Sequence, residues 1–171
     1  MRRGLIPGIL SAMAGLVLAA CVVEPPPGVS MPSKAGVPTA DARALRYGAT
    51  GPEILANPQL RDKVQALYGP DWNPTPKVPS GAPAYFPASS SIRLVTIGAD
   101  DYIAVTGCVQ SACGSNKGLL LIRQDGDQLL SRLDQGGLSH YYQYGVGATP
   151  NNVPRASIDG AWITIQRLDR S

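Results

Sequence analysis

The stretch that decides the fold lies at residues 92–134 and reads IRLVTIGADDYIAVTGCVQSACGSNKGLLLIRQDGDQLLSRLD. It holds four short apolar segments, separated by residues that favour turns, which is the pattern of a β-sheet. The segments are residues 92–97, 102–106, 118–124 and 128–134. Between the last two, Asp125-Gly126 is a strong hairpin signal. We therefore predict an antiparallel sheet, with Gly98-Ala99-Asp100-Asp101 as the turn between the first two strands.

Two further strands are expected after this stretch. One is residues 141–144, where three of four side chains are tyrosines. The other is residues 161–168, in which Trp162, Thr164 and Gln166 alternate with a second set of side chains. Alternation of this kind is typical of a strand with two unlike faces. The sheet is therefore predicted to have five or six strands.

The best helix signal comes earlier, at residues 57–68. Asn57 is suited to the N-cap and Pro58 to the first helical position. Apolar side chains then recur with helical spacing at Leu60, Val64 and Leu67. A short helical piece is also expected at residues 51–55. Together these elements predict an α+β fold, with one or two helices packed on one face of the antiparallel sheet.

The proline-rich connection at residues 71–87 joins this helix to the first strand. It carries Trp72, Tyr85 and Phe86. A connection that keeps large aromatic side chains gains by burying them. We therefore predict an ordered strap that pins its aromatic rings on the core.

Prolines and aromatic residues divide the chain. Thirteen of its 16 prolines lie between Pro25 and Pro87, and none lies at residues 88–149. All ten aromatic residues lie at or after Tyr47, so a packed core is not expected much earlier. We predict a single α+β domain at residues 47–171, which is long enough for one small core.

Residues 1–20 are predicted to be a lipoprotein signal peptide. Arg2 and Arg3 precede an apolar run, as in secretory signals. The run ends in Leu18-Ala19-Ala20-Cys21, which resembles the lipobox of bacterial lipoproteins. This resemblance implies that Cys21 becomes the mature N-terminus and carries covalent lipid, such as palmitate. Plain secretion or a transmembrane anchor is the alternative, although the run is short for a span of about 20 residues.

Residues 21–46 are predicted to be the lipidated cysteine and a disordered tether. They hold five prolines and no aromatic residue, and such a segment buries too little apolar surface to become ordered. The acyl chains would hold the protein at a membrane without a spanning segment. Val22, rather than aspartate, follows Cys21. By resemblance to the enterobacterial sorting rule, this favours the outer membrane, with the domain facing the periplasm or, alternatively, the outer surface.

Charge gives little support to nucleic-acid binding. The formal net charge of +3 falls to +1 when Arg2 and Arg3 leave with the signal peptide. The remaining chain has no Lys/Arg cluster of the kind that binds nucleic acid or anionic lipid.

The remaining cysteines, Cys108 and Cys113, are expected to form a disulfide, because exported proteins meet an oxidising compartment. A metal site is the alternative, but His140 is the sole histidine and no further thiol remains to complete a tetrahedral set. We therefore predict neither a metal nor any cofactor besides the lipid.

The sequence holds no complete catalytic set. Ser139 and His140 lie next to each other, but residues 137–141 lack the Gly-x-Ser-x-Gly spacing of a nucleophile elbow. Residues 114–118 lack the spacing of a phosphate loop, and residues 125–127 begin like a calcium loop without its later ligands. A binding protein is therefore predicted rather than an enzyme. The tyrosines of residues 139–144 either pack on a half-exposed strand or form a contact patch for sugar or protein.

The loop between the second and third strands carries a resemblance to a family. A Cys-x-x-x-x-Cys loop follows a strand that begins with tyrosine and precedes an apolar strand, while a helix and an aromatic Pro-Ala segment come earlier. The matching elements are residues 60–68, Trp72, residues 83–86, Tyr102, Cys108, Cys113 and residues 119–122. In this order of elements the sequence resembles the Ivy family, the inhibitors of vertebrate lysozyme.

This resemblance implies a periplasmic α+β protein that inserts the disulfide-closed loop into the cleft of c-type lysozymes. The inhibitory loop would be Val109, Gln110, Ser111 and Ala112. Ser111 and Ala112 stand where the family has histidine and aspartate, and a serine can still donate a hydrogen bond to a carboxylate. The alternative is a non-inhibitory envelope lipoprotein that acts as a protein- or peptidoglycan-interaction module.

Overall fold

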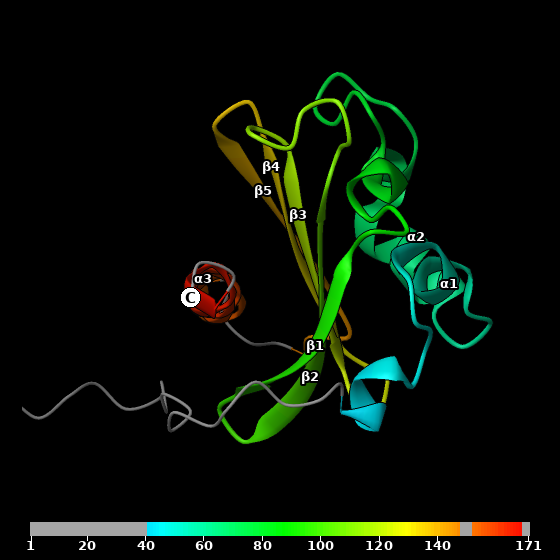
Figure 1. Ribbon diagram of the computed structural model, residues 1–171, viewed down its shortest axis with the longest axis vertical. Helices are drawn as coiled ribbons and strands as arrows, with labels where there is room; N and C mark the ends of the chain where they lie inside the picture. The colour runs from blue at the N-terminus through cyan, green and yellow to red at the C-terminus, as the bar shows by residue number, and fades with distance from the viewer. Residues whose placement is uncertain (1–40, 148–151, 169–171) are drawn as a thin grey trace, which may run out of the picture.

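The computed structural model describes residues 41–147 and 152–168. One sheet of five antiparallel strands forms its centre (Figure 1). The strands are β1 (Ser91–Ile97), β2 (Asp100–Cys108), β3 (Lys117–Arg123), β4 (Leu129–Gln135) and β5 (Leu138–Tyr144). The helices are α1 (Gly51–Ala56), α2 (Arg61–Tyr68) and α3 (Asn152–Leu168), with 3₁₀ turns η1 (Ala42–Leu45), η2 (Gly69–Trp72) and η3 (Ala82–Tyr85). The predicted α+β fold with an antiparallel sheet is therefore confirmed.

The strands lie in the sheet in the order in which they follow one another in the chain. The connection from β4 to β5 is as short as that from β1 to β2, and in it Gln135 pairs with Leu138 across a two-residue turn. This turn consists of Gly136 and Gly137, whose φ angles are 56° and 89°. Glycine adopts this left-handed backbone without steric cost, and such turns match the twist of paired strands.

The two predicted hairpin turns have different outcomes. Asp125-Gly126 lies in the connection between β3 and β4, as predicted, but this connection is longer than two residues. The turn predicted at residues 98–101 is shorter than expected, because Gly98 and Ala99 form it and both aspartates belong to β2.

The first apolar core lies between the sheet and the pair α1 and α2, on one side of the sheet in Figure 1. It includes Leu60, Val64 and Leu67, the residues whose spacing predicted a helix. Tyr85 and Phe86 are fully buried in the same core, so the aromatic strap is confirmed. From the same strap, the Lys77 ammonium reaches the Tyr142 ring of β5, at 4.6 Å from its centre.

The second core shows that the prediction of a strand at residues 161–168 is wrong. This segment belongs to α3, which covers the opposite face of the sheet (Figure 1). The buried residues of α3 are Ile158, Ala161, Trp162 and Ile165. They follow one another at intervals of three, one and three positions, which places them on one face of a helix. The helices therefore lie on both faces of the sheet and not on one.

Two boundaries also differ from the predictions. The helix predicted from Asn57 begins at Arg61, because Asn57 instead ends α1 and its side chain accepts a hydrogen bond from the Gln59 N–H at 2.9 Å. At the N-terminal end of the described residues, η1 is ordered within the predicted tether, with Ala44 buried and the Asp41 carboxylate capping the turn. The ordered domain thus begins at least six residues before Tyr47. Residues 1–40, which include the predicted signal peptide and Cys21, lie outside the described residues.

Within residues 41–147 and 152–168, no helix combines the length and the apolar character needed to cross a bilayer.

Candidate functional site

The loop between β2 and β3 is closed by a disulfide between Cys108 and Cys113, as predicted. The Cα atoms of the two cysteines are 4.9 Å apart. Between them, Gln110 and Ser111 are exposed, while Val109 and Ala112 are half-buried. We call residues 108–113 the disulfide loop. Its tip therefore presents an amide and a hydroxyl to solvent.

Backbone hydrogen bonds fix the shape of the disulfide loop. The Val109 N–H donates to the Asn116 carbonyl at 3.1 Å, and the Ala112 N–H donates to the Val109 carbonyl at 2.8 Å. The Asn116 N–H then donates to the Ala112 carbonyl at 2.8 Å. The Val109 side chain packs against the first core. The loop is thus anchored by a covalent bond, by hydrogen bonds and by one apolar side chain.

The disulfide loop is also tied to the hairpin of β4 and β5. The buried Asn116 side chain accepts a hydrogen bond from the Gly136 N–H, at 3.3 Å from Oδ1. Leu138, which follows the two glycines, is 67% exposed. The loop and the hairpin tip therefore lie at the same end of the sheet (Figure 1).

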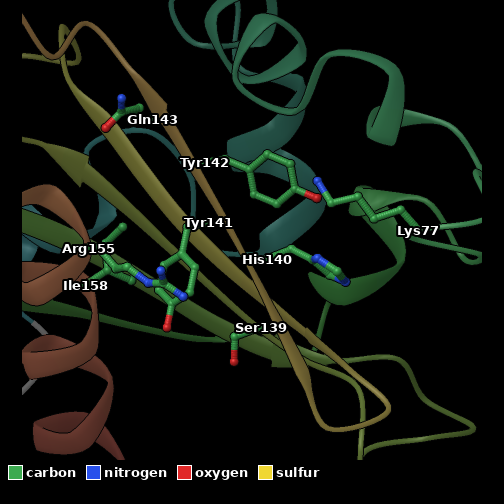
Figure 2. A pocket seen from close by; sticks show the side chains of 8 residues that line it. All are labelled: Lys77, Ser139, His140, Tyr141, Tyr142, Gln143, Arg155 and Ile158. Atoms are coloured by element: carbon green, nitrogen blue, oxygen red, sulfur yellow. The ribbon is translucent and has the colours of Figure 1, made fainter. Parts of the chain in front are cut away.

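A second candidate site is a cavity of about 430 Å³ along β5, which we call the β5 cavity. It is lined by Lys77, Ser139, His140, Tyr141, Tyr142, Gln143, Arg155 and Ile158. Figure 2 shows Lys77, His140 and Tyr142 on one side of the strand, and Tyr141, Arg155 and Ile158 on the other. The cavity therefore extends around the outer edge of β5, from the strap on one face of the sheet to α3 on the other.

On the strap side, a buried carboxylate organises the wall of the β5 cavity. Asp71 accepts hydrogen bonds from the Thr75 hydroxyl at 2.7 Å and from the Tyr142 hydroxyl at 2.8 Å. It also pairs with the Lys77 ammonium at 2.9 Å. Burial alone raises the pKa of Asp71, but the hydrogen bonds from Thr75, Lys77 and Tyr142 outweigh it and hold the pKa below its ordinary value.

The same carboxylate acts on its tyrosine partner. Burial, and the hydrogen bond to the negative Asp71, both raise the pKa of Tyr142. The Lys77 ammonium lies 4.6 Å from the centre of the Tyr142 ring, within the range of a cation–π contact. Tyr142 therefore remains a neutral hydrogen-bond donor in this wall.

On the α3 side, an ion-pair network joins the helix to the sheet. The Arg132 guanidinium pairs with Asp134 and with Asp159, both at 2.8 Å. The Tyr141 hydroxyl donates to Asp159 at 2.7 Å. The Arg155 guanidinium lies 4.2 Å from the centre of the Tyr141 ring. This wall of the cavity is therefore an aromatic ring covered by a cation.

The structure does not assemble a catalytic triad from Ser139 and His140. The Ser139 hydroxyl donates to Asp134 at 2.7 Å, and successive side chains of a strand point to opposite faces of the sheet. Burial lowers the pKa of His140, with a further lowering by the nearby Lys77. His140 is therefore a neutral side chain of the cavity wall near pH 7.

The described part of the chain has no group of three His, Cys, Asp or Glu side chains that could hold a metal ion. Val109, Gln110, Ser111 and Ala112 are brought together in the disulfide loop, as their sequence positions require. Sequence reasoning missed Lys77 and Arg155, the two cations of the β5 cavity. Only the cluster of tyrosines at residues 141–144 pointed toward this place.

Comparisons of the chain with protein-family models, with curated proteins and with solved structures gave no match.

Proposed function

We propose that the protein is an outer-membrane lipoprotein that inhibits a c-type lysozyme by inserting the disulfide loop into the enzyme's cleft. The proposal combines the lipobox resemblance, the resemblance to the Ivy family and one structural observation. That observation is the geometry of the disulfide loop, whose tip residues Gln110 and Ser111 are exposed while both of its ends are fixed.

A fixed loop supports binding because its conformational entropy is already lost before the partner arrives. The six residues of the disulfide loop need no reorganisation to enter a concave site if they keep the geometry set by Asn116 and the disulfide. Binding energy is then not spent on ordering the loop.

The chemistry of the tip suits a cleft that contains carboxylates. Glycosidases of this class carry a pair of them on either side of the scissile bond. The Ser111 hydroxyl and the Gln110 amide can each donate a hydrogen bond to such a group. Neither carries a charge, so each bond would be weaker than one from a protonated histidine.

The experiment uses purified residues 22–171 with the disulfide oxidised, added in excess to a c-type lysozyme acting on a cell-wall substrate. We expect lysozyme activity to fall. The variants Ser111→Trp and Cys108→Ser/Cys113→Ser should inhibit less, the first by steric clash in the cleft and the second by loosening the loop. Gln59→Trp, an equally bulky change at an exposed position in the α1–α2 connection, should inhibit as the parent does. Full lysozyme activity in the presence of excess oxidised protein would refute the proposal.

A second candidate function is a non-inhibitory envelope module that binds another envelope protein or peptidoglycan. The observation that favours it is the lack of charge at residues 109–112, because a neutral tip has no electrostatic preference for an enzyme's catalytic carboxylates. Purification of the lipidated protein from membranes would then retain a specific envelope partner. Retention that Ser111→Trp leaves unchanged would favour this function over lysozyme inhibition.

A further inference from the structure

The outer edge of β5 carries backbone groups that point away from the sheet. β5 is the last strand, so only β4 pairs with it. The two-residue turn makes Gln135 and Leu138 a hydrogen-bonded pair, and such pairs alternate along an antiparallel ladder. The N–H and C=O groups of Ser139 and Tyr141 therefore point outward. In the part of the chain that the structure describes, no backbone group hydrogen-bonds to them.

The β5 cavity lies along this edge. Its lining is made of consecutive β5 residues together with Lys77 from the strap and two residues of α3. In Figure 2, the side chains of Lys77 and Arg155 flank the strand on opposite sides. The cavity therefore has the form of a trough, with a strand edge along it and a cation on each side.

We propose that the β5 cavity binds an extended, acidic peptide segment of a partner protein, which adds a sixth strand to the sheet. Pairing with Ser139 and Tyr141 would give the segment four backbone hydrogen bonds, two from each residue. This mode of recognition takes affinity from the main chain and specificity from alternate side chains. The inference is independent of the function proposed for the disulfide loop.

The charges around the trough explain why one side chain of the segment should be a carboxylate. Lys77 is already paired with Asp71, and Arg132 with Asp134 and Asp159. Within the described residues, Arg155 pairs with no carboxylate, and its guanidinium lies over the ring of Tyr141. The three cations and the three aspartates named here therefore balance in charge, but the Arg155 guanidinium still has N–H donors that a carboxylate of the segment can accept from.

The ladder geometry places that carboxylate. A residue directly opposite Tyr141 in an added strand has its side chain on the same face of the sheet as Tyr141. The Arg155 guanidinium lies over the Tyr141 ring on that side of the sheet. A glutamate or aspartate opposite Tyr141 would therefore lie beside Arg155, whereas the side chains before and after it would face His140 and Lys77.

A second copy of this chain is a poorer occupant. Two β5 edges paired about a two-fold axis keep the same face of the sheet on the same side in both copies. Each Arg155 would then lie on the same face as the partner copy's Arg155, and like charges in such positions repel. A segment with carboxylates has the opposite sign.

The test is an NMR titration of ¹⁵N-labelled residues 22–171 with a capped hexapeptide, Thr-Glu-Val-Glu-Val-Thr, whose glutamates lie on one face when extended. We expect the amide signals of Ser139 and Tyr141 and the Nε signal of Arg155 to shift together. The same peptide with lysine in place of glutamate should bind about tenfold more weakly, the loss expected for a charge-assisted hydrogen bond. A peptide N-methylated at the residues that pair with β5 should not shift these signals.

The protein variants provide the second arm. Arg155→Glu should weaken the glutamate peptide about tenfold and strengthen the lysine peptide, because the change reverses a charge in the trough. Arg167→Glu, an exposed arginine of the same helix, should leave both affinities unchanged. Both side chains are exposed, so both variants should fold.

Four outcomes would overturn the proposal. The first is no shift of the Ser139 and Tyr141 amides at millimolar peptide, and the second is equal binding of the glutamate and lysine peptides. The third is a shift of these amides with protein concentration alone, which would indicate pairing of two copies. The fourth is a response of the cavity to peptidoglycan fragments but not to the peptide.

Discussion

The Tyr142 hydroxyl donates a hydrogen bond to Asp71 at 2.8 Å, although 71 positions separate the two residues in the chain. Asp71 is 8% exposed, and its other partners are Thr75 and Lys77. This bond joins the last strand of the sheet to the segment that follows α2. A buried carboxylate with three donors is a strong restraint, because loss of the charge leaves donors unpaired inside the protein.

We predict that acid weakens this restraint. The folded state holds the pKa of Asp71 below its ordinary value, so the charged form is favoured by folding. The resulting stability is present above the unfolded pKa of about 3.9 and is lost as the pH falls through the folded pKa. Urea unfolding between pH 7 and pH 3 should therefore show a falling free energy of unfolding.

The variant Asp71→Asn should remove this part of the pH dependence and lower the free energy of unfolding at pH 7 by about 1–3 kcal/mol. Asp62→Asn, at an exposed carboxylate of α2, is the matched control and should change neither quantity appreciably. A pH profile that Asp71→Asn leaves unchanged would contradict the prediction.

His140 should titrate below the ordinary histidine pKa of about 6.5. Burial disfavours the charged ring, and the positive Lys77 adds to the effect. Because the chain has one histidine, its ring protons give a single titration curve by NMR. The variant Lys77→Met should move this pKa upward, since the negative Asp71 would then act on the ring without compensation. No upward movement would mean that Lys77 does not influence the ring.

This lowered pKa has a consequence for stability. The unfolded chain takes up the proton at a higher pH than the folded protein does. The contribution of His140 to the free energy of unfolding should therefore be complete above about pH 6.5 and should decline as the pH falls from there through the folded pKa. His140→Gln should remove this decline without affecting the later one caused by Asp71.

Loss of the disulfide should lower the free energy of unfolding by about 2 kcal/mol, the chain-entropy value for so short a loop. The measurement is urea unfolding of the parent and of Cys108→Ser/Cys113→Ser, each with and without reductant. Reductant should destabilise the parent and leave the double variant unchanged. A parent that reductant does not affect would show that the bond contributes little to stability.

Trp162→Ala should cost about 3–5 kcal/mol of the free energy of unfolding, because it leaves a cavity between α3 and the sheet. Trp162 is buried in the second core with Leu119, Leu121 and Leu130. Ile163→Ala, the next residue of the same helix, is the control, since Ile163 is 48% exposed and should cost under about 1 kcal/mol. Equal losses for the two variants would contradict the packing of α3 on this face.

The strands could be predicted because short apolar runs and turn residues are local signals. The helix α3 could not be recognised from residues 161–168 alone. Over those eight positions its side chains alternate by chance, whereas the spacing that governs its burial begins at Ile158. A window that starts there shows helical periodicity, so the error came from the length of the segment considered.

The two candidate sites also differ in how well the sequence predicts them. The disulfide loop follows from two cysteines five positions apart, which is a local pattern. The β5 cavity depends on Lys77 and Arg155, which are far apart in the chain and meet only because the strap and α3 flank β5. No local pattern marks either cation, and an aromatic cluster was the one sign that the sequence offered.

The agreement between strand order and chain order bears on how the protein folds. Every strand pairs with the one before it, so each closing loop is short and its entropic cost is small. A chain of low contact order folds fast, and a sheet of this kind can form hairpin by hairpin. The helix α3 contacts both β1 and β4, so it can dock only after these strands are in place. Until then one apolar face of the sheet stays uncovered, and this short interval is when the new chain is most exposed to aggregation.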